Sequence, residues 1–169
     1  MRLAVTGTPG TGKTSATAAL DTDLTVVHLN DVIEREGLTT GTDDERGSAI
    51  ADMDAVADWL EDREDIVFES HLAHEFPADR VVVLRCHPEQ LERRLSERGT
   101  SPESVAENAE SEALDLILAE AVDHHGESAV YELDTTGRPV AAVAADIEQV
   151  IRGERQPGVG VVSFVDYLG

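Results

Sequence analysis

A glycine-rich stretch near the N-terminus has the residue types and the spacing that bind phosphate. It reads GTPGTGKTS at positions 7–15 and matches the pattern G-x-x-x-x-G-K-[ST], with an apolar run before it and a helical pattern after it. Glycines let backbone amides converge on phosphate oxygens, and the start of a helix adds its dipole. We therefore predict that a nucleotide binds through Gly7, Pro9, Gly10, Thr11, Gly12, Lys13, Thr14 and Ser15.

Lys13 is the only lysine in the 169 residues, and every other basic side chain is an arginine. A guanidinium is a planar fork, whereas a phosphate loop needs a compact charge on a flexible stem, so arginine is a poor substitute here. We predict that Lys13 is catalytic and reaches the outer phosphates, and that the Thr14 hydroxyl holds Mg²⁺. The single retained lysine therefore indicates phosphoryl chemistry.

Two arginines four residues apart are further catalytic candidates. Arg94 and Arg98 lie where a helical pattern gives way to a loop, while Arg93 would point elsewhere on the helix. Phosphoryl transfer depends on positioning and charge neutralisation, so a lysine, a magnesium ion and one or two arginines suffice. The alternative is that both are surface residues paired with Glu92 and Glu97.

The elements that position these residues appear as short apolar runs that alternate with helical patterns. Such alternation along the chain is typical of a parallel sheet covered by helices. Strands are predicted at residues 2–7, 24–29, 65–70, 80–85 and 128–133. Helices are predicted over 53–60 and 140–151, and one long helix begins after Ser101, its N-cap, and runs through residue 122. The inner face of that long helix comprises Ala106, Ala109, Ala113, Ile117 and Ala121. The fold class is α/β.

The composition combines the apolar content of a folded protein with extreme acidity. Asp and Glu number 35 against 13 Lys and Arg, for a net charge of -22, while 41% of the residues are hydrophobic. The acids are spread along the chain, which leaves adaptation to high salt or a basic protein partner as explanations. The lack of a basic stripe disfavours direct binding of nucleic acid. Without a signal-type or 18-residue apolar segment, no membrane association and a cytoplasmic location are expected.

One domain is predicted over residues 1–153, followed by a tail at 154–169. The tail begins with the turn-prone residues ERQPG and continues with alternating apolar residues. It is predicted either to form an edge strand or clamp on the protein's own surface or to dock a partner.

Several motifs together resemble one kinase subfamily. They are GTPGTGKT, LNDVIEREGL, FESHLAHEFP, VVVLRC, LERRLSERG and ENAESEA, spread over residues 1–125. The chain is similar over this range to the small adenylate kinases that include adenylate kinase isoenzyme 6, also described as the coilin-interacting nuclear ATPase, and its archaeal relatives.

This resemblance implies a phosphate-loop fold of the nucleoside monophosphate kinase type, with helices on both faces of the sheet and strand order 2-3-1-4-5. It also implies a monophosphate-binding arm at about residues 30–62 and a short lid at about 94–104. The implied reaction transfers the terminal phosphoryl group of ATP to AMP, with some ATP hydrolysis and with Mg²⁺ as cofactor. Eukaryotic relatives also act in maturation of the small ribosomal subunit through a basic ribosomal protein.

The resemblance also assigns roles to residues around the loop. Glu69 stands where the family usually has an aspartate that holds magnesium through water, and His71 matches a histidine that orients the water or the acceptor phosphate. Asp31 fits the family position in the arm. The arginine expected three residues later is Glu34 here, so the adjacent Arg35 is the candidate for the monophosphate site.

Other side chains remain open at this stage. Arg46 and Arg85 are alternative ligands of the acceptor phosphate, because no spacing argument selects among the arginines. His124 and His125 end a helical pattern before Gly126 and are expected to interact with the terminal carbonyls of that helix.

Two functions therefore compete, and a third possibility is another small-molecule kinase that uses the same loop, because acceptor specificity is set by details of the pocket. The first is a nucleoside monophosphate kinase with ATP as donor and AMP as acceptor. The second is an ATPase that assists assembly of the small ribosomal subunit by acting on a basic ribosomal protein, and Glu34 in place of arginine favours it because a weak AMP site leaves hydrolysis as the main chemistry.

Overall fold

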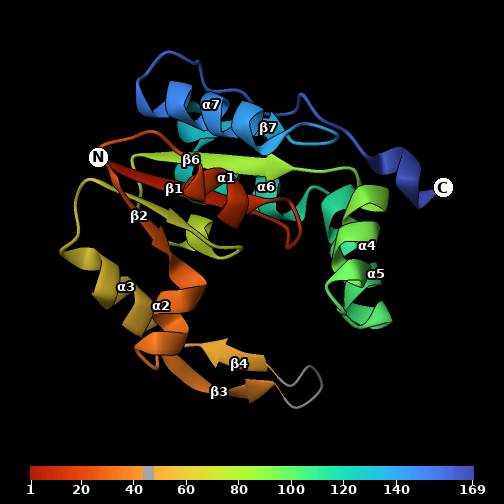
Figure 1. Cartoon of the computed structure of the whole chain (residues 1–169), viewed down its shortest axis with the longest axis horizontal. Helices are drawn as coiled ribbons and strands as arrows, with labels where there is room; N and C mark the ends of the chain where they lie inside the picture. The colour runs from red at the N-terminus through yellow and green to blue at the C-terminus, as the bar shows by residue number, and fades with distance from the viewer. Residues whose placement is uncertain (44–47) are drawn as a thin grey trace.

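A five-stranded parallel sheet forms the centre of the molecule (Figure 1). The computed structural model describes residues 1–43 and 48–169. The sheet contains β1 (Arg2–Gly7), β2 (Thr25–His28), β5 (Ile66–Glu69), β6 (Arg80–Arg85) and β7 (Val130–Asp134), in the order β2-β5-β1-β6-β7. Counted along the chain, this is the expected order 2-3-1-4-5. The five predicted strands are confirmed, with ends displaced by no more than two residues.

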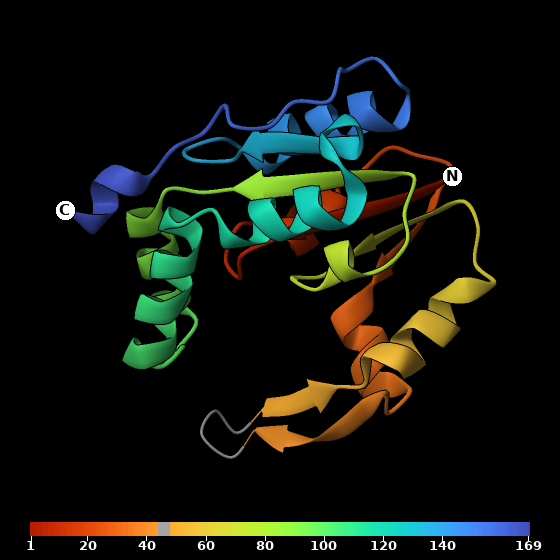
Figure 2. The same cartoon turned by 180° about the vertical axis from the view of Figure 1, so that it is seen from behind.

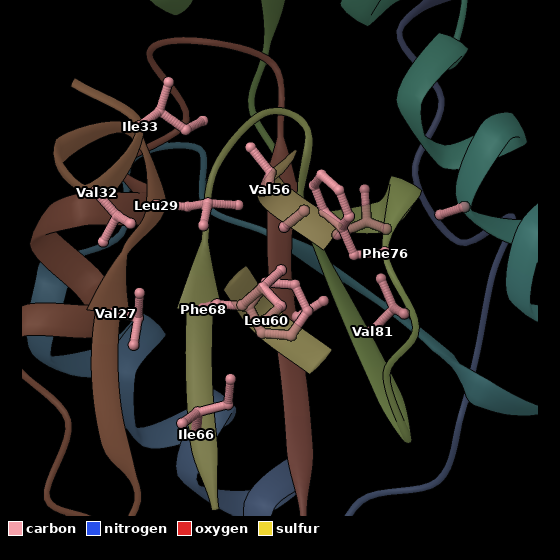
Figure 3. Close-up of a cluster of buried hydrophobic side chains, with 14 of the residues drawn as sticks. Val27, Leu29, Val32, Ile33, Val56, Leu60, Ile66, Phe68, Phe76 and Val81 are labelled. Atoms are coloured by element: carbon pink, nitrogen blue, oxygen red, sulfur yellow. The ribbon is translucent and has the colours of Figure 1, made fainter. Parts of the chain in front are cut away.

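Side chains on both faces of the sheet are buried, which explains why the strands read as continuous apolar runs. Successive residues of β1 point to opposite faces, so Leu3 and Val5 belong to one core and Ala4 belongs to the other. Figure 3 shows the second core, with Phe68 of β5 and Leu60 near its centre. Packing on both faces of the sheet therefore fixes the carboxyl ends of its strands.

Helices cover the two faces unequally. One face carries α2 (Leu29–Arg35), α3 (Met53–Glu61) and α6 (Leu116–His125), and the other carries α1 (Lys13–Ala18) and α7 (Val140–Ile151). The helices predicted over 53–60 and 140–151 are thus confirmed. None of the helices in the described part of the chain has the length and apolar character needed to cross a bilayer.

An arm is made of α2, β3 (Thr39–Asp43), β4 (Ser48–Ala51) and α3. α2 and α3 connect the arm to the sheet, and β3 and β4 extend away from it. β3 and β4 form an antiparallel pair of their own, separate from the main sheet. The Asp52 side chain accepts a hydrogen bond from the backbone N–H of Ala55 and caps α3. Figures 1 and 2 show that the arm and the pair of helices α4 (Pro88–Glu97) and α5 (Pro102–Ala113) project from the same side of the sheet.

The long helix predicted from Ser101 to residue 122 is wrong as a single element. Ser101 does cap α5, accepting a hydrogen bond from the N–H of Ser104, but α5 ends at Ala113 and α6 begins at Leu116. Between them Asp115 adopts a φ of 57°, in the left-handed region, and its carboxylate accepts a hydrogen bond from Arg85. The buried face of α5 includes Val105, Ala109 and Ala113, so Ala106, which was expected on the inner face, is exposed.

The tail lies along the protein's own sheet, as the clamp hypothesis predicted. The N–H of Gly158 donates to the carbonyl of Val130, and the carbonyl of Gly158 accepts from Glu132, which makes an isolated parallel bridge at the edge strand β7. Further on, Phe164 is buried and the Tyr167 hydroxyl donates to Glu92 of α4. The tail thus connects the edge of the sheet to α4.

The acidic composition predicts a stability that depends on salt. Repulsion within a chain of net charge -22 is screened over about 3 Å at 1 M salt but over about 10 Å at 0.1 M. We expect the melting temperature to fall by about 10 °C or more between about 2 M and 0.1 M KCl, with about 2–4 °C for each kcal/mol lost. Differential scanning calorimetry across this series measures the effect, and a melting temperature indifferent to KCl would contradict it.

Candidate functional site

The glycine-rich loop joins β1 to α1 at the carboxyl end of the sheet, in the strand–loop–helix context that the motif requires. Gly7 has a φ of 152°, and a Cβ there would lie 2.7 Å from the carbonyl oxygen of Leu84. Gly10 has a φ of 95°, and a Cβ there would meet the side chain of Leu91 at 3.0 Å. The loop can therefore approach β6 and α4 this closely only with glycine at both positions.

Lys13 is a buried cation at the start of α1, with 8% of its surface exposed. Its ammonium donates hydrogen bonds to the carbonyls of Gly7 at 2.9 Å and Thr8 at 3.1 Å. Burial, with a smaller contribution from Arg98, lowers the pKa of Lys13 to about 8. Among the described residues, no carboxylate lies within 4.0 Å of the ammonium. An anionic ligand at the loop would therefore stabilise the charged form of Lys13.

Thr14 and Glu69 bring two oxygen ligands together beside the loop. The Thr14 hydroxyl donates to Oε1 of Glu69 at 3.0 Å, and Nδ1 of His28 lies 2.8 Å from the same oxygen. Glu69 is buried at the end of β5, where it pairs in register with Val5 of β1. A hydroxyl and a carboxylate suit a hard divalent cation such as Mg²⁺, so the side chains present fit the metal that was expected here.

His28 is a residue of this site that the sequence reasoning missed. It ends β2 in register with Glu69, because β2 and β5 are neighbours in the sheet. The strand order 2-3-1-4-5 together with the positions of the two strand ends would have predicted this contact.

His71 follows β5 and stands beside the loop. Burial, together with the charge of Lys13 and the nearby His74, lowers the pKa of His71 to about 4. The imidazole is therefore neutral at pH 7 and can both donate and accept a hydrogen bond.

Three hollows meet around these residues. The loop hollow, of about 270 Å³, shares His71 and Asn30 with a hollow of about 730 Å³ under the arm, the arm hollow. It shares Arg98 and Gly10 with a hollow of about 250 Å³ beside α7, the α7 hollow. The loop hollow thus lies between two spaces that can each hold part of a ligand, and Lys13 lines it.

The two predicted catalytic arginines occupy different positions. Nη1 of Arg94 donates to the carbonyl of Gly10 at 2.9 Å, so this side chain holds the loop. Arg98 is exposed at the end of α4 and lines both the loop hollow and the α7 hollow. Neither forms an ion pair with Glu92 or Glu97 in the part of the chain that the structure describes. The surface-pair alternative is therefore wrong for these partners.

In the arm, the structure separates the residues predicted to bind the monophosphate. Glu34 lines the arm hollow, whereas Arg35 does not. The Arg35 side chain is 64% exposed, and its Nε lies 3.4 Å from Glu36. Asp31 is exposed on the same helix. Arg46 lies outside the described residues.

Arg85 is not available to a phosphate, which corrects its inclusion among the candidates for the acceptor site. The side chain is 1% exposed and donates to Glu112, to Asp115 and, at 2.6 Å, to Glu132. Glu112 in turn accepts a hydrogen bond at 2.9 Å from the hydroxyl of Thr8 in the loop. The sequence reasoning missed this network, because its members are separated by at least 27 positions from Arg85.

His124 and His125 do not interact with the end of their own helix as expected. His124 Nε2 lies 3.3 Å from Glu75, and His125 Nε2 donates to the carbonyl of His74 at 2.8 Å. Both contacts reach the single-turn helix η1 (Ala73–Glu75) after β5. These histidines therefore join α6 to η1.

Known proteins resemble the chain over most of its length. A family model described as an AAA domain matches residues 3–115. A protein of Halobacterium salinarum named "Putative adenylate kinase" is 59% identical over 169 residues, which cover 99% of this chain and 100% of the relative. Relatives with the same name are 57% identical in Natronomonas pharaonis (99% and 100% covered) and 42% identical in Methanosarcina acetivorans (89% and 86% covered).

Solved structures share the fold at low sequence identity. A shikimate kinase from Bacteroides thetaiotaomicron superposes with a TM-score of 0.58 at 16% identity, covering 90% of this chain and 98% of that one. A sugar kinase from Janibacter sp. HTCC2649 superposes with a TM-score of 0.55 at 19% identity, covering 89% and 94%. At these identities the likeness concerns the fold alone.

The buried arginine predicts a large loss of stability on substitution. In Arg85→Met the carboxylates of Glu112 and Glu132 stay buried without their cation, so the free energy of unfolding should fall by about 3–5 kcal/mol. Urea unfolding in about 2 M KCl, which screens the surface charge, measures it. The matched control is Arg35→Met, at an exposed arginine, which should change stability by no more than about 0.5 kcal/mol. Equal effects of the two substitutions would contradict the buried network.

The lowered pKa of His71 predicts a stability that falls in mild acid. The unfolded chain takes up the proton near pH 6.5 and the folded chain only near pH 4, so stability falls as the pH drops through this window. In His71→Gln this contribution disappears, and the variant should lose less stability than the parent between pH 6.5 and 4. Urea unfolding at both pH values, with NMR titration of the imidazole, tests it. An NMR midpoint near 6.5 would refute the shift.

Proposed function

The chain belongs to the archaeal adenylate kinase family represented by these relatives, and from this premise we propose that it transfers the terminal phosphoryl group of ATP to AMP and forms two ADP. The observation that supports this most directly is the position of the loop hollow, which shares residues with the α7 hollow on one side and the arm hollow on the other. A reaction between two nucleotides needs two binding spaces that meet at the transferred group.

The donor nucleotide fits the α7 hollow and the loop. Arg138, Thr135, Val140 and Val143 line the α7 hollow, which gives a base and sugar both polar and apolar contacts. The triphosphate then extends along residues 7–15 toward Lys13. The lowered pKa of Lys13 supports this placement, because a bound phosphate compensates the buried charge.

In the reaction, an oxygen of the AMP phosphate attacks the terminal phosphorus of ATP. The bond between this phosphorus and the bridging oxygen breaks, and ADP leaves with the electron pair. Lys13 and Arg98 are proposed to neutralise the charge of the transferring group, which is the main demand of phosphoryl transfer. Arg94 contributes by holding Gly10 and thus the loop. Neutral His71, at the junction of two hollows, is proposed to orient the acceptor phosphate.

Magnesium is proposed to bind beside the loop through Thr14 and, directly or through water, Glu69. When bound, Mg²⁺ neutralises charge on the outer phosphates of ATP. Glu69 is a longer acid than the family's usual aspartate, and the hydrogen bond from His28 fixes the position of its carboxylate.

The acceptor is proposed to bind against the arm, with Asp31 and Arg35 as its candidate ligands. Arg35 pairs only with its neighbour Glu36 in the described residues, and such exposed pairs are worth about 0–1 kcal/mol, so the side chain is free to reorient toward an anion. Glu34 cannot serve as a ligand of the phosphate, since it carries the same sign of charge.

The narrower resemblance to the isoenzyme 6 type rests on the motifs of residues 1–125, and we infer it from them alone. The assembly function of that subfamily is a separate hypothesis. The relationship to the archaeal adenylate kinases does not identify a ribosomal protein as its partner. A cytoplasmic location and adaptation to high salt are likewise inferences from composition. The kinase and the assembly ATPase differ in the products that they form.

The product balance distinguishes the two activities. We expect the purified protein in about 2 M KCl, chosen to screen its charge, to form two ADP for each ATP consumed from MgATP, and only when AMP is present. Chromatographic quantification of the nucleotides measures this for each nucleoside monophosphate in turn. ADP and free phosphate in equal amounts, unaffected by any monophosphate, would instead indicate an ATPase and send the search to a basic partner.

Variants in the same assay locate the chemistry. Lys13→Ala should abolish turnover while leaving the folded state intact. Arg98→Ala should lower kcat by about 10²-fold with a smaller effect on the KM for ATP, because its contact strengthens as charge develops. Arg93→Ala is the matched control, an exposed arginine on the same helix that lines none of the three hollows, and it should leave kcat unchanged.

A further inference from the structure

A cluster of metal-ligating side chains lies apart from the loop, between η1 and α6. Nε2 of His74 is 2.7 Å from Oε2 of Glu120 and 3.3 Å from Oε1 of Glu75. Nε2 of His124 is 3.3 Å from the other oxygen of Glu75. Within residues 1–43 and 48–169, His74, Glu75 and Glu120 form the one group whose ligand atoms all lie within 4.8 Å of one another. His124 lies next to this group through its contact with the second oxygen of Glu75.

The contacts around His74 resemble those that orient a histidine ligand. The side chain is 1% exposed, and its Nδ1 lies 2.7 Å from the hydroxyl of Thr6 in β1. The carbonyl of His74 accepts a hydrogen bond from His125, which fixes the backbone as well. Histidines that bind metals almost always have such a partner on the second ring nitrogen, since it sets the ring's orientation. Nε2 of His74 is thereby directed at the two glutamates.

From these observations we propose that Nε2 of His74, Nε2 of His124 and the carboxylates of Glu75 and Glu120 form a tetrahedral site for a divalent transition metal of the zinc class. Ligands about 2.0–2.1 Å from a tetrahedral ion are separated from one another by about 3.3 Å. The 3.3 Å between Nε2 of His74 and Oε1 of Glu75 matches such a separation, and the 2.7 Å between His74 and Glu120 lengthens with a small rotation of the 53% exposed Glu120. His124, which contacts the other oxygen of Glu75 and is 44% exposed, would join the same ion by rotation of its side chain.

The ligand set selects the class of metal. Two imidazoles suit zinc, cobalt or nickel, whereas Mg²⁺ prefers oxygen ligands and retains water. Two carboxylates also balance the charge of one divalent ion. This mixture distinguishes the cluster from the many acidic side chains elsewhere on the surface, which provide oxygens alone.

The site would link two segments that matter to the fold. η1 lies between β5, with Glu69 and His71 at its end, and β6, while α6 follows the break at Asp115. Through Thr6, His74 also contacts the strand that ends in the phosphate loop. The metal would therefore fix η1 against α6. This inference does not depend on the proposed phosphoryl transfer, and its test measures no turnover.

Cobalt provides a spectroscopic test on the full chain. Protein stripped with EDTA is titrated with Co²⁺ in about 2 M KCl, which screens surface charge, with Mg²⁺ in excess to occupy oxygen-only sites. We expect one equivalent to produce the intense visible absorption of tetrahedral Co²⁺. Zn²⁺ should abolish the absorption and raise the melting temperature. The weak absorption of octahedral Co²⁺, or no binding at all, would overturn the proposal.

Variants identify the ligands without disturbing the buried His74. Glu120→Gln and His124→Ala, both at exposed positions, should each weaken Co²⁺ binding by at least about tenfold, and Thr6→Val by about 10–100-fold through the orientation of His74. Asp123→Asn is the control, because it removes an exposed acid from the same helix outside the cluster and should leave the affinity unchanged. Equal affinities in Glu120→Gln, His124→Ala and the control would show adventitious binding and refute the site.

Discussion

The ion pair between Arg85 and Glu112 joins more parts of this molecule than any other contact described above. Arg85 ends β6, and its guanidinium also meets Glu132 of β7 and Asp115 at the break between α5 and α6. Glu112 accepts the hydroxyl of Thr8, so the same network reaches the phosphate loop. Buried charges are tolerated only when each is paired and hydrogen-bonded, and here the pairing draws the sheet, the α4–α5 projection and the loop together.

The tail depends on the same network. Glu132 accepts the backbone N–H groups of Val161 at 2.8 Å and Val162 at 3.3 Å through the oxygen that does not contact Arg85. Phe164 lies with its ring 5.3 Å from the guanidinium carbon of Arg85 and covers it. The last residues of the chain therefore help to exclude water from the Arg85 charge, which is linked to the loop through Glu112 and Thr8.

The sequence predicted the parts of the fold that local pattern determines. The five strands, the phosphate loop and the Ser101 cap follow from apolar runs, motif spacing and capping chemistry. The break at Asp115 did not follow, because the apolar spacing continues across it and the left-handed conformation is held by Arg85, 30 positions away. Arg85 itself was taken for a phosphate ligand for the same reason, since only the tertiary fold reveals the acids that surround it. His28 and Glu69 meet through the strand order, which the family resemblance implied.

Two of the buried charges near the carboxyl edge of the sheet, Arg85 and Glu69, have contrasting surroundings. Arg85 is enclosed by protein acids and is not available to a substrate, whereas Glu69 lines the loop hollow, where a cation is proposed to bind. In the proposed reaction, the lining of the arm hollow indicates which end of AMP it would hold. Its described lining is largely apolar, with Ile33, Met53 and Leu72 among its members, and its charged residue is Glu34. Such a surface favours a nucleobase and disfavours a phosphate. In the proposed reaction AMP would therefore place its base in the arm hollow and its phosphate outside that hollow, toward Arg98 and Lys13 at the loop or toward a reoriented Arg35.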